Sequence, residues 1–171
     1  MSIRSSPSQL IAVDSNVPLD LADGNERVID AISILRARLP EARFVITPSV
    51  FQELAHVAFH DAKPARRSLG VNALRRCREW RIDFLEIVPV GHGIVESVAN
   101  RLRAAGLLPT SEVHDSLILA EAALLGCSIL LTSDGHLRGI DHVHLTWELN
   151  ACDVAVPVIA TPREIVNKFF R

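Results

Sequence analysis

Residues 10–16 read LIAVDSN, an apolar run that is followed at once by a carboxylate and an amide. The four residues Leu10 to Val13 predict a buried strand, because a short, continuous apolar run suits a strand covered on both faces. Asp14 comes directly after it. In an open parallel sheet, ligands bind beyond the carboxyl ends of the strands. This segment therefore predicts both a strand of the sheet and one part of a site.

Similar apolar segments alternate with helical ones along the rest of the chain. Strands are expected at 43–47, 84–90, 127–132 and 154–159, and helices at 26–39, 48–59, 65–80, 93–105, 113–125 and 161–169. Ser49 is expected to cap the second of these helices, with Gln52 completing a capping box, and Thr161 to cap the last. The alternation predicts a three-layer α/β/α sandwich with a central, mainly parallel sheet of about five strands.

The composition indicates an ordinary globular protein. The chain has 171 residues, of which 49% are hydrophobic and 22% charged. We expect one domain over residues 10–171 after a flexible N-terminal tail at 1–9. The N-terminus lacks the apolar core of a signal peptide and no apolar run is long enough to span a bilayer, which favours a cytoplasmic protein without a membrane partner. Cys77, Cys127 and Cys152 form no metal-binding or disulfide pattern.

Four acidic residues stand where a strand ends or a helix begins, and they are Asp14, Glu53, Asp115 and Asp134. The alternating pattern delivers all four to the same rim of the sheet. Grouped carboxylates repel one another and are costly to bury, so such a group usually persists because a hard cation such as Mg²⁺ or Mn²⁺ neutralises it. Taken singly, each acid could equally be a turn residue, a helix cap or an exposed helix residue.

Basic residues gather in one window although the net charge is −2. A local basic group can bind phosphates even when a separate acidic group cancels the total charge. The alternative is a solvated helix face. The candidate RNA contacts are Arg66, Arg67, Arg75, Arg76 and Arg78.

With these four acids in this order, the chain resembles the PIN domain family, the PilT N-terminus-like nucleases that include the VapC-type toxins. Asp14 and Asn16 match the family's opening D-x-N motif, and Glu53 in SVFQEL matches its second acid. HDSLILAEA, from residue 114, supplies the third acid, and Thr132, Ser133 and Asp134 match its T-x-D motif. The chain departs from the family after Asp134, where Leu137 replaces an aromatic residue and the segment 140–153 is longer than in compact toxins.

The resemblance implies an endoribonuclease dependent on Mg²⁺ or Mn²⁺, with the four acids as metal ligands. Glu53 or Asp115 would help to take the proton of the attacking water. It further implies that Asn16, Thr132 and Ser133 orient the acids by hydrogen bonds. Glu112 is a possible peripheral ligand, and His136 a possible phosphate contact. Small toxins of this family pair with an antitoxin protein and commonly form homodimers, so both partners are expected besides RNA.

Three other interpretations remain open. The chain could be a catalytically quiet PIN-like module that binds RNA or a protein, although a dead site has no reason to retain four acids. Glu53, His56 and His60 share one helical face at a spacing that suits zinc or iron. A haloacid dehalogenase-type phosphatase also places an Asp after its first strand, but it needs a second Asp where this chain has Asn16.

Overall fold

A five-stranded parallel sheet lies at the centre of the computed structural model, which describes residues 9–169. The strand order is β3-β2-β1-β4-β5, and every neighbouring pair is parallel. The strands are β1 (Leu10–Val13), β2 (Arg43–Ile46), β3 (Ile82–Phe84), β4 (Ile129–Leu131) and β5 (Val158–Ala160). The predicted parallel sheet is confirmed, and it is parallel throughout. Of the predicted tail, all but Gln9 lies outside the described residues.

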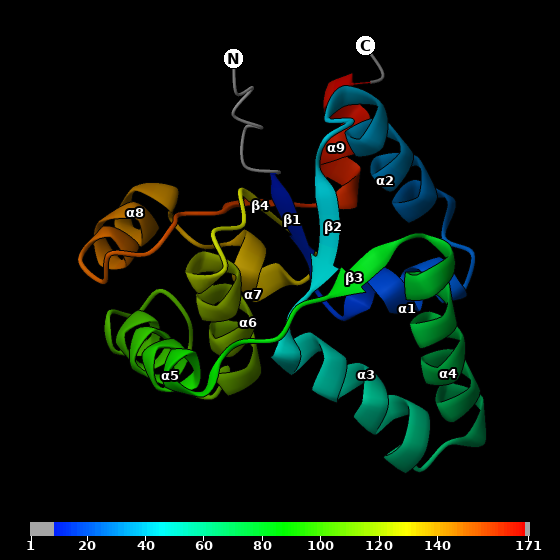
Figure 1. Cartoon of the computed structure of the whole chain (residues 1–171), viewed down its shortest axis with the longest axis horizontal. Helices are drawn as coiled ribbons and strands as arrows, with labels where there is room; N and C mark the ends of the chain where they lie inside the picture. The colour runs from blue at the N-terminus through cyan, green and yellow to red at the C-terminus, as the bar shows by residue number, and fades with distance from the viewer. Residues whose placement is uncertain (1–8, 170–171) are drawn as a thin grey trace, which may run out of the picture.

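Helices cover both faces of the sheet (Figure 1), which confirms the predicted three-layer arrangement. α5 and α6 pack together on one side, whereas α2 packs with α9, and α1 with α4, on the other. The helices are α1 (Asn16–Ala22), α2 (Glu26–Arg38), α3 (Pro48–His60), α4 (Pro64–Glu79), α5 (Pro89–Ala104), α6 (Val113–Leu124), α7 (Gly135–Arg138), α8 (His142–Asn150) and α9 (Pro162–Phe169).

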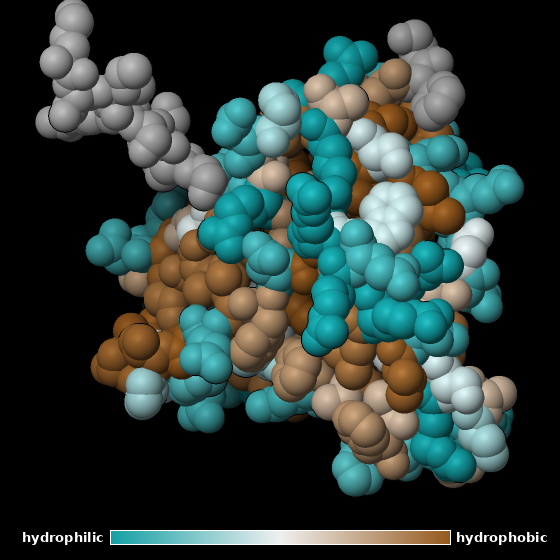
Figure 2. Space-filling model, turned by 45° about the vertical axis from the view of Figure 1, so that its right-hand side comes forward, coloured by the Kyte–Doolittle hydropathy of each residue, from teal (hydrophilic) through white to brown (hydrophobic). Residues whose placement is uncertain are grey.

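The central strand β1 lies inside the core except for its first residue, Leu10, which is partly buried. Ile11, Ala12 and Val13 have no exposed surface, because both faces of the sheet carry helices. Cys127 is also buried, and burial raises the pKa of its thiol to about 12. Within the described residues, no helix is both long and apolar enough to cross a membrane. Figure 2 shows the outer surface, where hydrophobic patches lie between polar areas.

Two strands lie at other positions than the sequence predicts. The third strand is Ile82–Phe84 rather than 84–90, because its partner β2 ends at Ile46 and residues after Leu85 have no strand to pair with. Pro89 then begins α5, four residues earlier than expected. The fifth strand starts at Val158 rather than 154, since Pro157 has no N–H with which to join the ladder.

Helix ends follow local chemistry, with one correction. Thr161 and Glu164 form a capping box at the start of α9, as predicted for Thr161. Ser49, in contrast, is no cap. Pro48 is the first residue of α3 and Thr47 takes the capping position, so Ser49 lies inside the helix. The sequence pattern also missed α1, which begins only two residues after Asp14.

Gly70 allows α3 and α4 to approach each other closely. A Cβ at this position would lie 2.6 Å from the backbone nitrogen of Ala58 and 2.8 Å from its Cα. Gly93, in the first half of α5, has no atom within 4 Å of the same position. Glycine lowers the helix propensity of α4, but at position 70 it is the residue that lets α4 pack closely against α3.

We expect Gly70→Ala to lower the free energy of unfolding by about 1–3 kcal/mol, because the added methyl group forces two backbones apart. The control Gly93→Ala should instead be neutral or raise it by up to about 1 kcal/mol, since alanine favours helices and meets open space there. Urea denaturation of both variants measures the difference. Equal effects of the two substitutions would contradict the close approach.

Candidate metal centre

The carboxyl ends of three neighbouring strands bring polar residues into one row. Val13 is paired with Leu131, so the next residues, Asp14 and Thr132, lie side by side. The register of β1 with β2, continued by two residues, sets Thr47 on the other side of Asp14. All three residues are buried. The parallel register of β1 with β2 and β4 therefore places these three polar residues next to one another at the carboxyl edge of the sheet.

Asp14 is held by four hydrogen bonds. Its Oδ2 accepts from the Thr132 hydroxyl and from the Asn16 amide, both at 2.6 Å. Its Oδ1 accepts from the Ser15 N–H at 2.6 Å and from the Ser15 hydroxyl at 3.4 Å. Burial raises the pKa of Asp14 above 3.8, the Thr132 and Ser15 hydrogen bonds oppose the rise, and the charge of Glu53 adds to it.

The Thr132 hydroxyl also connects Asp14 to Asp134. Its oxygen accepts from the Asp134 N–H at 2.9 Å while its hydrogen is donated to Asp14. The Ser133 N–H donates to Asn16 Oδ1 at 3.0 Å. Asn16 and Thr132 thus hold Asp14 through their side chains, whereas Ser133 contributes its backbone N–H to Asn16. Asp134 caps α7, where its carboxylate accepts from the His136 and Leu137 N–H groups.

Asp115, in the first turn of α6, faces this group of carboxylates. The pKa of Asp115 is raised from 3.8 to about 7, first by burial and then by the negative charges of Asp134, Asp14 and Glu112, against an opposing effect of His136. Glu53, in α3, is half-buried and acts on Asp14 through its charge. The four predicted acids are thus linked electrostatically in a chain, Glu53 to Asp14, Asp14 to Asp115 and Asp134 to Asp115. No ion pair within the described residues joins any of them to lysine or arginine.

These donors fit a hard divalent cation. Mg²⁺ and Mn²⁺ take carboxylate oxygens by preference, and the rim offers several carboxylates whose mutual repulsion a cation would relieve. Thr47 Oγ1, beside Asp14, is a buried oxygen without a hydrogen-bond partner among the described residues. With a cation bound, the arrangement is suited to the hydrolysis of phosphate esters.

His136 and Glu112 lie closer to the acids than the sequence suggests. A ligand atom from each of Glu112, Asp115 and His136 lies within 4.8 Å of the other two, and this group includes neither His56 nor His60. His56 and His60 stack on each other along the exposed side of α3, with ring centroids 5.5 Å apart. The alternative zinc or iron site at Glu53, His56 and His60 thus gains no support.

Glu121 is a buried residue that the sequence interpretation missed. It lies in α6 with 3% of its surface exposed, and its carboxylate accepts from the Ser49 N–H at 3.0 and 3.2 Å and from the Ser49 hydroxyl at 2.8 Å. This carboxylate lies at the positive N-terminal end of α3. It thereby ties α6, which carries Asp115, to α3, which carries Glu53. The sequence does show a single glutamate within an otherwise apolar helical segment, and this pattern could have indicated a buried carboxylate with a polar partner.

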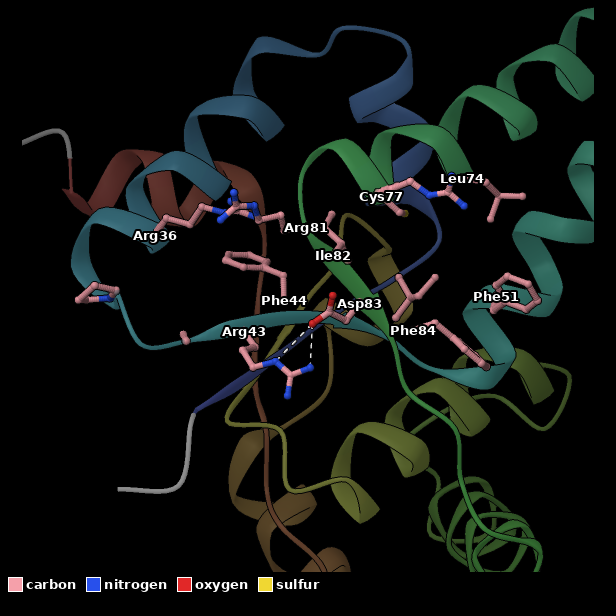
Figure 3. Close-up of a pocket in the computed structure, with 14 residues that line it drawn as sticks. Arg36, Arg43, Phe44, Phe51, Leu74, Cys77, Arg81, Ile82, Asp83 and Phe84 are labelled. Carbon is pink, nitrogen blue, oxygen red and sulfur yellow. Dashed lines mark hydrogen bonds and ion pairs between the residues drawn. The ribbon is translucent and has the colours of Figure 1, made fainter. Parts of the chain in front are cut away.

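The basic residues of α4 are divided among several contacts. Arg66 pairs with Asp61, and Arg75 and Arg76 with Glu79. Arg67 donates to the Asp61 carbonyl, and Arg78 lines a pocket beside the edge strand β3. Figure 3 shows this pocket, with Arg43 paired to Asp83 at its edge. None of the four acids lines it. Its residues are Arg36, Pro40, Ala42, Arg43, Phe44, Ile46, Phe51, Leu74, Cys77, Arg78, Arg81, Ile82, Asp83 and Phe84.

Comparison with known proteins identifies a family model and a fold. The model of the PIN domain matches residues 11–143. Among solved structures, one match is VapBC2 from Rickettsia felis, solved in complex with a DNA fragment from its promoter. This match has a TM-score of 0.62 and 12% sequence identity, and it covers 90% of this chain and 98% of that chain. VapBC-1 from nontypeable Haemophilus influenzae matches with a TM-score of 0.58 and 17% identity, over 91% and 99%. Among curated protein sequences, none matches.

The raised pKa of Asp115 predicts a pH-dependent stability in metal-free buffer. The folded protein holds this proton more tightly than the unfolded chain, so ionisation destabilises the fold progressively from about pH 4 to about pH 7. Asp115→Asn cannot ionise. Its free energy of unfolding, relative to wild type, should therefore rise over this range and level off above about pH 7. Urea unfolding in EDTA at several pH values measures this difference in free energy, and parallel pH curves for the two proteins would contradict the prediction.

Adding Mg²⁺ should raise the free energy of unfolding of wild type more than that of Asp115→Asn.

Replacing Glu121 should weaken the junction of α3 and α6. Glu121→Leu leaves two buried Ser49 donors without an acceptor, and we expect a loss of about 2–4 kcal/mol in the free energy of unfolding. Glu121→Gln keeps a carbonyl oxygen and should lose less. Urea denaturation compares the two variants, and equal losses would show that the hydrogen bonds to Ser49 carry little of the effect.

Proposed function

Because the chain belongs to the PIN domain family, we propose that it is an endoribonuclease, dependent on Mg²⁺ or Mn²⁺, that hydrolyses phosphodiester bonds. The observation that carries this proposal is the group of carboxylates on Asp14, Glu53, Asp115 and Asp134. The charge of Glu53 raises the pKa of Asp14, and the charges of Asp14 and Asp134 raise that of Asp115. None of the four pairs with lysine or arginine among the described residues. All four lie within the matched span, residues 11–143.

We assign the four carboxylates to the binding of the divalent ion. When bound, such an ion supplies Lewis-acid chemistry, which activates water for attack on phosphorus and stabilises the negative charge that develops on the phosphate. Asp14 is best suited to fixed coordination, because its hydrogen bonds to Thr132 and Asn16 leave it little freedom. Asp134 is held in a similar way by the N–H groups of α7.

We assign RNA as the substrate and the arginines of α4 as contacts to its phosphates. Arg66, Arg67, Arg75, Arg76 and Arg78 lie along one helix. The ion pairs of Arg66 with Asp61, and of Arg75 and Arg76 with Glu79, lie at or near the surface, where ion pairs are weak enough to exchange for phosphate. Because such contacts are electrostatic, binding through them would weaken with rising salt.

We further propose that the chain is the toxin of a toxin–antitoxin pair, with an antitoxin protein as partner and a homodimer as the assembled form. The similarity of its fold to VapBC2 and VapBC-1 supports this assignment. Large exposed apolar side chains are a second support, since such surface commonly marks a protein contact. On α5 and α8 these are Val90, Ile94, Val143 and Trp147.

A catalytically quiet module that binds RNA or a protein is the second candidate. Such a module could bind its partner through the same basic and apolar surfaces. Only the carboxylates therefore distinguish the nuclease from the quiet module. Asp14 and Asp115 are costly to bury together, and a binding module would gain nothing from that cost.

The decisive test is cleavage of a mixed RNA pool with Mg²⁺ or Mn²⁺. We expect cleavage by wild type, none in EDTA, and a loss of at least about 100-fold in Asp14→Asn, since removal of a metal ligand weakens both binding and charge stabilisation. Asp30→Asn is the matched control, because Asp30 is an exposed carboxylate on α2, and it should cleave like wild type.

Two results would overturn the proposal. Cleavage that survives EDTA or the Asp14 substitution would exclude the carboxylate site. RNA binding without cleavage under either metal, by a protein whose circular dichroism confirms its fold, would establish the quiet module instead.

A further inference from the structure

His136 reaches from α7 to the start of α6. Its Nδ1 lies 3.6 Å from Glu112 Oε1, 3.9 Å from Asp115 Oδ2 and 4.0 Å from Asp134 Oδ1. The ring is about half exposed, whereas Asp115 is largely covered. One imidazole nitrogen therefore faces three carboxylates that come from two separate parts of the chain.

The local backbone explains this placement. Asp134 caps α7 and accepts the His136 N–H at 2.7 Å, which fixes His136 in the first turn beside the rim. Glu112 occupies the capping position of α6, yet its side chain makes no capping hydrogen bond there. Its carboxylate is thus available to His136 at the mouth of the site.

The separations suit ligands of one ion. With metal–ligand bonds of about 2.1 Å, two neighbouring ligand atoms lie roughly 3–3.5 Å apart. The contacts of His136 with Glu112 and Asp115, at 3.6 and 3.9 Å, exceed that range by only a few tenths of an ångström. Small rotations of exposed side chains would close this difference, whereas a direct charged hydrogen bond would need a nitrogen–oxygen distance below about 3 Å.

We propose that Glu112, Asp115 and His136 form a second cation position, next to the one at Asp14, that prefers Mn²⁺ or another first-row transition ion to Mg²⁺. This inference rests on the proposed carboxylate metal site, with which it shares Asp115. The preference follows from the donor set, because imidazole nitrogen is a poor ligand for Mg²⁺ and a good one for transition ions. The competing interpretation is a simple ion pair of His136 with the acids.

Electron paramagnetic resonance with Mn²⁺ tests the position without a cleavage assay. The signal of free Mn²⁺ gives the number of ions bound and their affinity, and pulsed measurements detect ¹⁴N of a coordinated imidazole. We expect wild type to bind two Mn²⁺ ions with ¹⁴N coupling. His136→Gln should lose the coupling, and one of its two ions should bind at least about tenfold more weakly. Mg²⁺ should displace that ion more readily from the variant than from wild type.

His144→Gln is the matched control. His144 Nε2 lies 3.5 Å from Glu148 in α8, so it is a histidine of the same kind with a carboxylate neighbour but outside the cluster. This variant should bind Mn²⁺ like wild type and keep the ¹⁴N coupling. Glu112→Gln should weaken one ion while keeping the coupling, because the imidazole ligand remains.

The outcomes separate the two proposals. Wild type that binds Mn²⁺ without ¹⁴N coupling, or a coupling that persists in His136→Gln, overturns the second position and leaves the carboxylate site in place. A wild-type protein that binds no Mn²⁺ overturns both.

Discussion

The cost of holding several carboxylates close together, with one of them buried, is the constraint on which the rest of the rim depends. Asp14 is almost fully buried and Asp115 has its pKa raised to about 7, so both are costly in the ionised form. Geometry offsets part of this cost. A single hydroxyl, that of Thr132, donates to Asp14 and accepts from the Asp134 N–H. It can do both only because the parallel register of β1 and β4 sets it beside Asp14. The pairing of two strands therefore determines where two acids lie.

The acids on helices depend on a different contact. Glu53 and Asp115 belong to α3 and α6, which no strand register aligns. Glu121 performs this alignment by placing its carboxylate against the first N–H groups of α3, where a buried negative charge is best tolerated. Glu121, whose carboxylate makes a packing contact, thus joins the two helices that carry the candidate ligands Glu53 and Asp115. Close packing of α3 on α4 at Gly70 restrains the same helix from its other side.

The sequence predicts the features that local patterns encode and misses those that depend on distant partners. The apolar run of β1, the position of Asp14 directly after it and the cap at Thr161 are local, and the structure confirms them. The resemblance to the PIN domain family is also confirmed. The third strand was wrong because its length is limited by where β2 ends. Ser49 was wrong as a cap because Pro48 already begins α3, and its contact with Glu121, 72 residues away, is not encoded locally. His136 faces the acids only because α7 and α6 meet in space, which spacing alone does not indicate.

The distribution of arginine gives the strongest reason to regard the rim as a cation receptor. The chain has 18 lysine and arginine residues, and it uses arginine to neutralise acids elsewhere, in pairs such as Arg43 with Asp83 and Arg101 with Glu148. Those acids lie at or near the surface, where water would screen an unpaired charge. The rim acids need a counter-charge more, yet among the described residues only the titratable His136 approaches them. An arginine there would fill the space between the carboxylates and stabilise the fold. With none there among the described residues, the counter-charge is left to the proposed cation, whose binding would recover stability that the grouped acids cost.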